Sequence, residues 1–232
     1  MDAVCTVLYA DIVDSTRWCE RLGATAAAKL WLRHDRESRT LARRCQATEV
    51  GRSDGFLLVL PTPASALEFA CAYHALLNRL HEGLQARIGL HCGEGRLRAN
   101  SPEDTALGAT RFELEGLVLP MVARVLSAAG PGQTLLTRAL ADALGSDAQA
   151  CLSHGHWRLK GIAEPLELLE ALHPLAPRVP PADSAKAHRV VRLGTDWVAR
   201  ADLPHNLPAE RDTDRKSTRL NSSHLVISYA VF

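Results

Sequence analysis

The sequence predicts an α+β fold of the ferredoxin-like or palm-like type, in which helices pack on one face of a largely antiparallel sheet. Three observations carry this prediction. β-rich runs and helical stripes follow one another in the order β-α-β-β-α-β-α-β and end in a hairpin. A tight turn, Gly51-Arg-Ser-Asp-Gly55, joins the two central runs and is too short for a parallel crossover. The first run, residues 4–12, is mostly apolar, as in a strand that is buried on both faces.

The first strand and the helical stretch after it are predicted from spacing. Residues 4–12 form the strand, and Asp11 lies near its C-terminal end. Ser15 or Thr16 can cap the helical stretch that follows, and Gly23 divides that stretch in two. Side chains recur along it at helical spacing: Ala27, Leu30, Trp31, His34, Ser38 and Leu41.

The central hairpin and the later elements complete the pattern. The Asp-Gly pair of the central hairpin is the strongest short hairpin signal in the chain, and it places Asp54 at the hairpin tip. A helix of about five turns follows Pro61-Thr-Pro63. The remaining predicted elements are a strand at 85–91, a short helix ending at 128–132, a strand at 133–137, and a hairpin of 157–160 with 166–169 around Gly161.

Composition limits the class of protein. With 232 residues, 47% hydrophobic and 23% charged, the chain is long enough for one α/β domain and a short extension. No apolar run is long enough to span a membrane, and no secretory signal opens the chain, so we expect a cytoplasmic protein. Six scattered cysteines argue against a zinc site or a disulfide framework. A net charge of +1 gives no electrostatic case for a nucleic-acid partner.

The C-terminal quarter differs in composition from the rest. Residues 1–175 are predicted to be the folded domain, and the Pro-rich residues 176–213 a linker to a missing C-terminal module. Residues 214–232 resemble the translation of a sequencing adapter, which would make them a disordered artefact of a truncated gene. The alternative is a natural disordered terminus.

Several sequence blocks together resemble the catalytic domain of class III nucleotide cyclases, over about three quarters of the chain. The blocks are Tyr9-Ala-Asp-Ile-Val-Asp-Ser-Thr16, Ser53-Asp-Gly-Phe56, Ala86-Arg-Ile-Gly-Leu-His-Cys-Gly-Glu94, residues 116–124, residues 129–136 and residues 159–165. The resemblance implies an enzyme that converts a nucleoside triphosphate, ATP or GTP, to a 3′,5′-cyclic nucleotide and pyrophosphate in intracellular signalling. It also implies a homodimer, whose pockets take metal ligands from one subunit and an arginine from the other.

The first two blocks carry the expected metal ligands. The reaction needs two Mg²⁺ or Mn²⁺ ions, hard cations that take oxygen ligands and few carboxylates, because phosphate oxygens and waters complete the shell. Asp11 ends one strand and Asp54 tips a neighbouring hairpin, so the two carboxylates can converge on one side of the sheet. The Ile12 carbonyl can complete the shell of the second ion. By the resemblance, Thr16 also belongs to the nucleotide site.

The later blocks carry the nucleotide contacts that the resemblance implies. Arg124 matches the arginine that contacts the transition-state phosphate, while Pro120 replaces the asparagine that steadies the ribose. Lys160 resembles the lysine that contacts the polyphosphate. For the base, Glu113 can accept from the adenine amino group.

One base-reading position departs from the family. Val50 stands where the family has a purine-reading lysine, and it cannot donate a hydrogen bond. Arg52, two residues from Asp54 and predicted on the same strand face as Asp54, could substitute for that lysine.

Purely structural roles for three of these residues, and a second function for the chain, stay open. Asp11 alone could satisfy backbone N–H groups, Asp54 could be a turn residue, and Arg124 an exposed helix arginine. The substitutions at Val50 and Pro120 motivate the second function, a catalytically silent module that binds nucleotide or dimerises to regulate a downstream domain. A diguanylate cyclase is disfavoured, because its Gly-Gly-(Asp or Glu)-Glu-Phe signature is absent.

Overall fold

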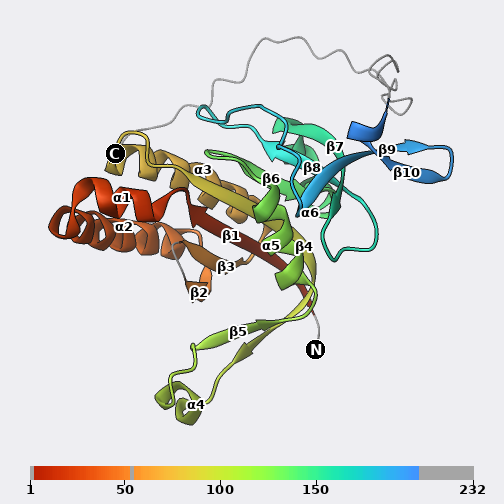
Figure 1. The fold of residues 1–232 in the computed structure, drawn as a ribbon. Helices are drawn as coiled ribbons and strands as arrows, with labels where there is room; N and C mark the ends of the chain where they lie inside the picture. The colour runs from red at the N-terminus through yellow and green to blue at the C-terminus, as the bar shows by residue number, and fades with distance from the viewer. Residues whose placement is uncertain (1–2, 53–54, 204–232) are drawn as a thin grey trace. The chain divides into compact units, whose positions relative to one another are not determined.

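The computed structural model describes residues 3–52 and 55–203, which contain a ten-stranded sheet. Its strands are β1 (Ala3–Ile12), β2 (Thr48–Arg52), β3 (Phe56–Leu60), β4 (Ala86–Ala99), β5 (Phe112–Glu115), β6 (Thr134–Thr137), β7 (Cys151–Leu159), β8 (Leu166–Ala171), β9 (Ala187–Leu193) and β10 (Asp196–Ala199). Their order is β10-β9-β7-β8-β6-β4-β1-β3-β2, with β5 paired to β4 (Figure 1). Only the β4–β6 pair is parallel among these described strands. The predicted α+β fold is confirmed.

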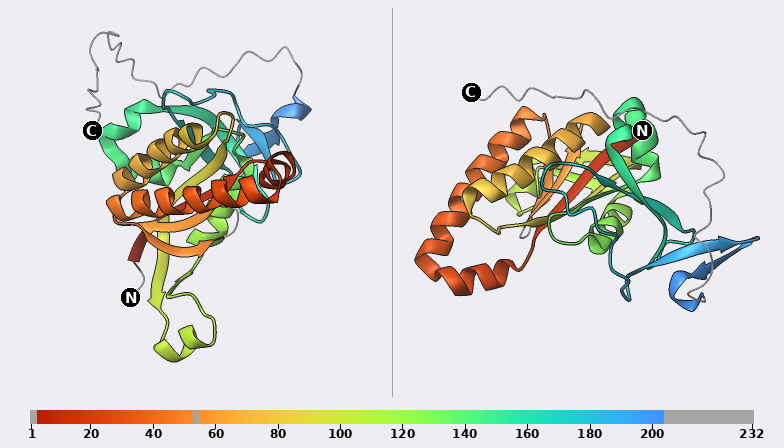
Figure 2. Two further views of the ribbon diagram at one scale, coloured as in Figure 1. Left: turned by 90° about the vertical axis from the view of Figure 1, so that its left-hand side faces the viewer. Right: turned by 90° about the horizontal axis from the view of Figure 1, so that it is seen from above.

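The helices cover both faces of the sheet. They are α1 (Ser15–Leu22), α2 (Ala24–Arg44), α3 (Pro63–Leu80), α4 (Pro102–Ala106), α5 (Val118–Ala128) and α6 (Arg138–Leu144), with 3₁₀ turns η1 (Gly145–Ala150) and η2 (Arg200–Asp202). The expected packing on one face holds for α1, α2, α3 and α6, which share one core with the sheet. The α5 helix lies on the opposite face (Figure 2). None of the helices in the described ranges is both long and apolar enough to cross a bilayer.

Strand β1 explains how the two cores form. Because successive side chains point to opposite faces, Leu8, Ala10 and Ile12 pack with α2 and α3, whereas Cys5 and Val7 pack with α5. Both sets are nearly fully buried. This double burial is why residues 4–12 read as a mostly apolar run, and it places the central strand between two layers of helix.

A glycine on β4 lets α5 approach the sheet closely. A Cβ at Gly89 would lie 2.5 Å from the Leu126 nitrogen and 2.8 Å from the Val122 oxygen, both in the backbone of α5. Such contacts leave no room for a side chain. The glycine of the Arg-Ile-Gly-Leu block therefore has a packing role.

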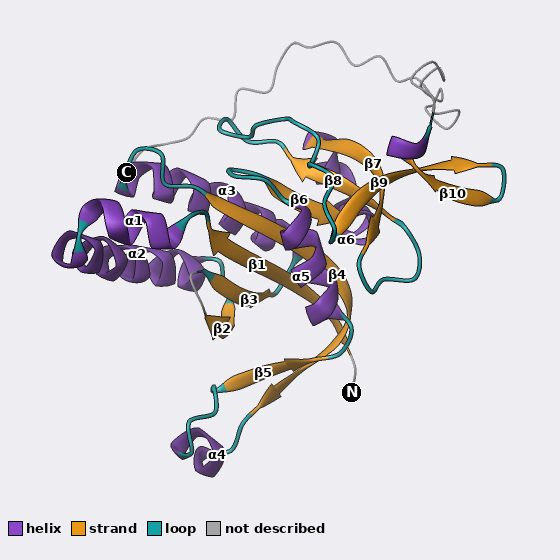
Figure 3. Ribbon diagram, in the orientation of Figure 1, coloured by secondary structure: helices purple, strands orange, loops and turns teal. Residues whose placement is uncertain are grey.

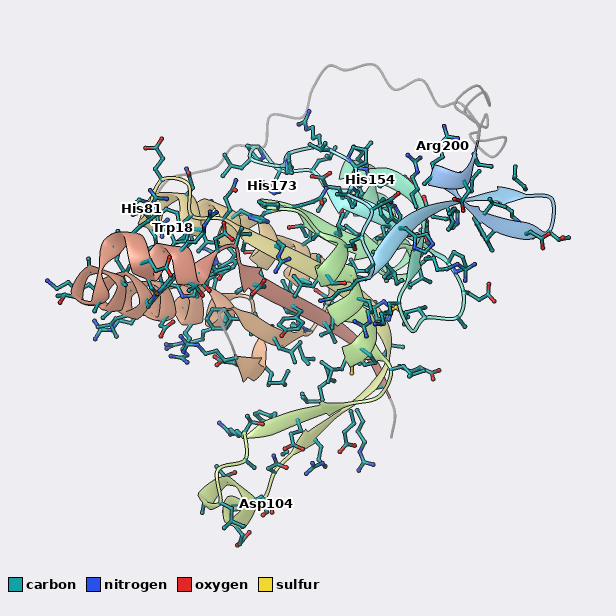
Figure 4. All side chains as sticks on the ribbon, viewed as in Figure 1. Trp18, His81, Asp104, His154, His173 and Arg200 are labelled. Carbon is teal, nitrogen blue, oxygen red and sulfur yellow. The ribbon has the colours of Figure 1, made fainter. Side chains whose placement is uncertain are left out.

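Strand β4 is longer than the predicted 85–91 strand. Its outer part, from Arg96 to Ala99, pairs with β5 instead of with the main sheet. We call residues 96–115 the arm; it projects from the sheet in Figure 3 and carries α4 at its end. Asp104, labelled in Figure 4, marks that end.

The linker prediction is wrong for residues 187–199. These residues form β9 and β10, and β9 pairs with β7. The physical reason is burial: Ala187 and Val190 pack into the sheet, and the Trp197 ring lies 4.7 Å from that of His156. Predicted linker residues 204–213 and the adapter-like residues 214–232 lie outside the described residues.

Candidate functional site

The turn between β1 and α1 builds the centre of the site. Asp11 and Ile12 end β1, and the Val13 N–H donates to the Gln85 carbonyl at 2.9 Å, which ties the turn to the strand start next to it. Asp14 adopts a left-handed conformation (φ 55°) and is the N-cap residue of α1, ahead of Ser15 and Thr16. Its side chain makes no capping bond within the described residues and instead pairs with Arg17. The first turn of α1 therefore lacks a side-chain cap from Asp14.

Aromatic packing holds α1 in place. The Trp18 ring lies edge-on to the His81 ring, with centroids 4.7 Å apart, and the two side chains lie together in Figure 4. Because His81 ends α3, this contact fixes the short α1 helix against a much longer one. The start of α1 is thus positioned relative to the core.

Asp11 has a cationic partner that the sequence did not identify. Asp11 stands directly opposite Arg87 in the antiparallel pairing of β1 with β4, and the Arg87 guanidinium forms an ion pair with its carboxylate. The two side chains are 25% and 38% exposed. The Arg87 Nε is buried and has no hydrogen-bond partner in residues 3–52 and 55–203. Only the antiparallel register of β1 and β4 shows that Arg87 faces Asp11. That register cannot be derived from the sequence without knowing which strands pair.

The β2–β3 hairpin approaches Asp11 through its glycine. A Cβ at Gly55 would overlap the carbonyl of Ala10 and lie 2.9 Å from the Asp11 Cα. This close approach requires glycine at that position. Asp54 itself lies outside the described residues, so the predicted convergence of Asp11 and Asp54 stays a prediction.

A cavity of about 330 Å³ opens beside the turn. It is lined by Ile12, Ser15, Thr16, Cys19, Trp31, His34, Asp35 and Arg52. Three of the predicted site residues, Ile12, Thr16 and Arg52, therefore line one cavity.

Arg52 does not face the base-reading position. Its guanidinium pairs with Asp35 of α2 and lies over the Phe56 ring, 5.5 Å from the centroid. Val50 instead packs in the core beneath α5, and the register of β2 shifts between Glu49 and Gly51. This bulge breaks the alternation between Val50 and Arg52. The predicted shared face of Arg52 and Asp54 stays a prediction, because Asp54 lies outside the described residues.

A buried hydrogen-bond chain supports Asp35. His34 Nδ1 lies 3.2 Å from Asp35 Oδ1, and His34 Nε2 lies 2.8 Å from the Tyr73 hydroxyl. Burial lowers the pKa of His34, so the ring is neutral at physiological pH. Because a carboxylate only accepts, Nδ1 carries the proton and Nε2 accepts from Tyr73. Burial raises the pKa of Asp35, but the hydrogen bonds from Arg52 and His34 outweigh it and hold that pKa low.

Glu113, Arg124 and Lys160 do not line this cavity. Glu113 lies on the arm, where it pairs with Arg98 and accepts from Asn100 at 3.1 Å. Arg124 is half-buried on α5, across the sheet from α2, and Lys160 is exposed just after β7. Pro120 is exposed in the first turn of α5. Within one chain, the structure brings Ile12, Thr16 and Arg52 to this cavity but not these three.

Solved structures share this fold. No family model matches the chain, and no curated protein matches it. An adenylate cyclase from Trypanosoma brucei, described in its monomeric state, is 22% identical (TM-score 0.64) over 75% of this chain and 91% of its own. The adenylyl cyclase CyaB from P. aeruginosa is 16% identical (TM-score 0.66) over 75% and 95%. The guanylate cyclase domain of RhGC from Catenaria anguillulae, solved with GTP, is 19% identical (TM-score 0.56) over 73% and 96%. This chain has the fold of class III cyclase catalytic domains.

Proposed function

We propose that this chain is a nucleotide cyclase that converts ATP or GTP to a 3′,5′-cyclic nucleotide and pyrophosphate, as part of intracellular signalling. One observation carries the proposal: Asp11 ends the central strand, pairs with the Arg87 guanidinium, and is followed by Ile12, which lines a cavity at the start of α1. In a fold shared with adenylyl and guanylyl cyclases, this places a carboxylate, a guanidinium and a helix start together. These are the groups that hold a metal-bound triphosphate.

The residues fit a divalent cation at Asp11. The carboxylate is partly exposed and its counter-ion is a side chain, so a metal ion can take the place of the guanidinium without burying an unpaired charge. Asp11, the Ile12 carbonyl and Asp54 would hold two Mg²⁺ or Mn²⁺ ions. When bound, such ions neutralise the triphosphate and assist attack of the ribose 3′-hydroxyl on the α-phosphate.

Arg87 then acquires a second role. Its guanidinium belongs to a side chain that is 38% exposed and is held at the strand end by cross-strand pairing with Asp11. A phosphate oxygen is a suitable acceptor for this donor, because guanidinium groups pair with phosphates through two parallel hydrogen bonds. Arg87 would therefore orient the triphosphate beside the carboxylate.

We further propose that the active form is a homodimer. Arg124 lies on α5, on the face opposite α2, so it does not reach the cavity of its own chain. A second copy would have to bring Arg124 to the Asp11 site, where it can stabilise charge on the reacting phosphate. A monomer would lack this contribution, because its own Arg124 does not reach its cavity.

A second candidate, a silent module, is favoured by Pro120 and Val50. Pro120 offers no amide to the ribose, and Val50 is a buried core residue that cannot read a base. Such a module would bind nucleotide or dimerise without turnover.

One assay separates the two candidates. The purified full chain is incubated with Mn²⁺ and each of ATP, GTP, CTP and UTP, and cyclic products are measured by mass spectrometry. An active cyclase gives product from at least one triphosphate, and the Asp11→Asn variant gives none. Thermal stabilisation by nucleotide without any product would favour the silent module, and neither product nor stabilisation would leave only dimerisation.

A further inference from the structure

Arg52 is the one cation among the described residues that line the cavity. The other polar groups there are the hydroxyls of Ser15 and Thr16, the carboxylate of Asp35 and the imidazole of His34. The imidazole is neutral, because burial lowers its pKa. The Arg52 guanidinium is therefore the one formal positive charge among the described lining residues, and it is paired with the Asp35 carboxylate.

The guanidinium is also held in a fixed position. Asp35 binds it through Nη2, and the Phe56 ring lies beneath it at 5.5 Å from the centroid. Asp35 is in turn fixed by His34, which Tyr73 anchors in the core. A guanidinium has five N–H donors, so the group is oriented by Asp35 while keeping donors for a ligand. Its side chain is 31% exposed, so a ligand in the cavity can reach it.

The surroundings favour an anion. The amino-terminal end of α1 adds partial positive charge, and the Asp14 side chain pairs with Arg17 instead of capping the helix. Arg52 and this helix start face one cavity, whereas Val50, at the position that reads the base in similar cyclases, packs on the other face of the sheet. A phosphate suits the Arg52 side of the site better than a purine does.

We propose that Arg52 binds the terminal phosphates of the nucleoside triphosphate, and that it sets the preference for triphosphate over monophosphate. This inference rests on the proposed function and assigns Arg52 to the leaving pyrophosphate instead of to the base. Asp35 is a positioning residue that orients the guanidinium. No proton or bond changes at Arg52; its charge stabilises the pyrophosphate as it departs.

The test measures binding without turnover. Full-length protein is titrated by calorimetry, in Mn²⁺, with 3′-deoxyadenosine mono-, di- and triphosphate and the same guanosine series; these cannot cyclise because they lack the 3′-hydroxyl. Arg52→Gln should weaken triphosphate binding about 10- to 100-fold and leave monophosphate binding unchanged, and Arg52→Lys should recover part of the loss. The ratio of adenosine to guanosine affinities should not change.

Two further variants make the test decisive. Arg39→Gln is the matched control, because Arg39 pairs with Glu49 and does not line the cavity, and it should bind the whole series as wild type does. If Arg52→Gln folds poorly because Asp35 loses its partner, the Arg52→Gln, Asp35→Asn double variant removes the orphaned charge and is measured instead.

Three results would overturn the proposal. Unchanged triphosphate affinity in Arg52→Gln would overturn the proposal for Arg52. It would leave the proposed function standing, because the wild-type protein would still bind nucleotide. Equal losses for mono- and triphosphate with a changed base preference would return Arg52 to the base. Wild-type protein that binds no member of either series would overturn the proposed function as well.

Discussion

Substituting Gly55 should damage the site and the fold together. In Gly55→Ala the new Cβ would overlap the Ala10 carbonyl and lie 2.9 Å from the Asp11 Cα. Both neighbours are backbone of the central strand, so no side-chain rotation relieves the contact. Overpacking of this kind costs about 1–3 kcal/mol. For a chain of this size, we expect Tm to fall by about 2–12 °C.

The same change should reduce activity beyond its effect on stability. The hairpin that carries Asp54 must move away from β1, and a misplacement of about 1 Å costs up to about 100-fold in rate. Gly51→Ala is the matched control in the same hairpin, because its Cβ would meet only Leu57 side-chain atoms at 3.5 and 3.6 Å. Differential scanning calorimetry and the Mn²⁺-dependent cyclase assay measure both effects. Equal melting temperatures for the two variants, or full activity in Gly55→Ala, would refute the reasoning.

Three further predictions concern single side chains. Asp11→Asn should lower product formation by more than about 100-fold, because losing even an outer-shell partner of a metal costs up to about 100-fold. The circular dichroism spectrum should not change. Turnover by Asp11→Asn at the wild-type rate would contradict a metal-binding role for Asp11. Burial lowers the pKa of His74 to about 3, below its unfolded value, so its contribution to stability is present above about pH 6.5 and is lost as pH falls towards 3. Urea unfolding between pH 7 and 5 should therefore show a shallower pH slope in His74→Gln, by up to about 1.4 kcal/mol per unit, and equal slopes would contradict this. Tyr73→Phe should destabilise the protein by about 1–3 kcal/mol, because His34 Nε2 loses its buried donor, and an unchanged urea midpoint would show that the bond contributes little.

The sequence predicted the elements whose signal is local. A mostly apolar run, typical of burial on two faces, defined β1, the Asp-Gly pair defined the hairpin, and Gly23 separated α1 from α2, as its φ of 74° shows. The position of Asp11 at the end of a strand followed from the same pattern. These features depend on residues a few positions apart, which a single sequence contains.

The features that the sequence missed depend on tertiary contacts. Arg87 pairs with Asp11 only because β1 and β4 are antiparallel neighbours in one register. Arg52 turns towards α2 because β2 has a bulge, and a one-residue shift moves a side chain to the other face. Strand β9 forms because Val190 and Ala187 find a buried edge on β7. None of these can be derived from spacing alone.

The central claim is that Asp11 holds divalent cations against a triphosphate, and Mn²⁺ binding tests it most directly. Electron paramagnetic resonance of full-length protein with 3′-deoxy-triphosphate should show two bound Mn²⁺ ions per site in the wild type and a clear loss of bound Mn²⁺ in Asp11→Asn. Equal Mn²⁺ binding by the two proteins would contradict the account.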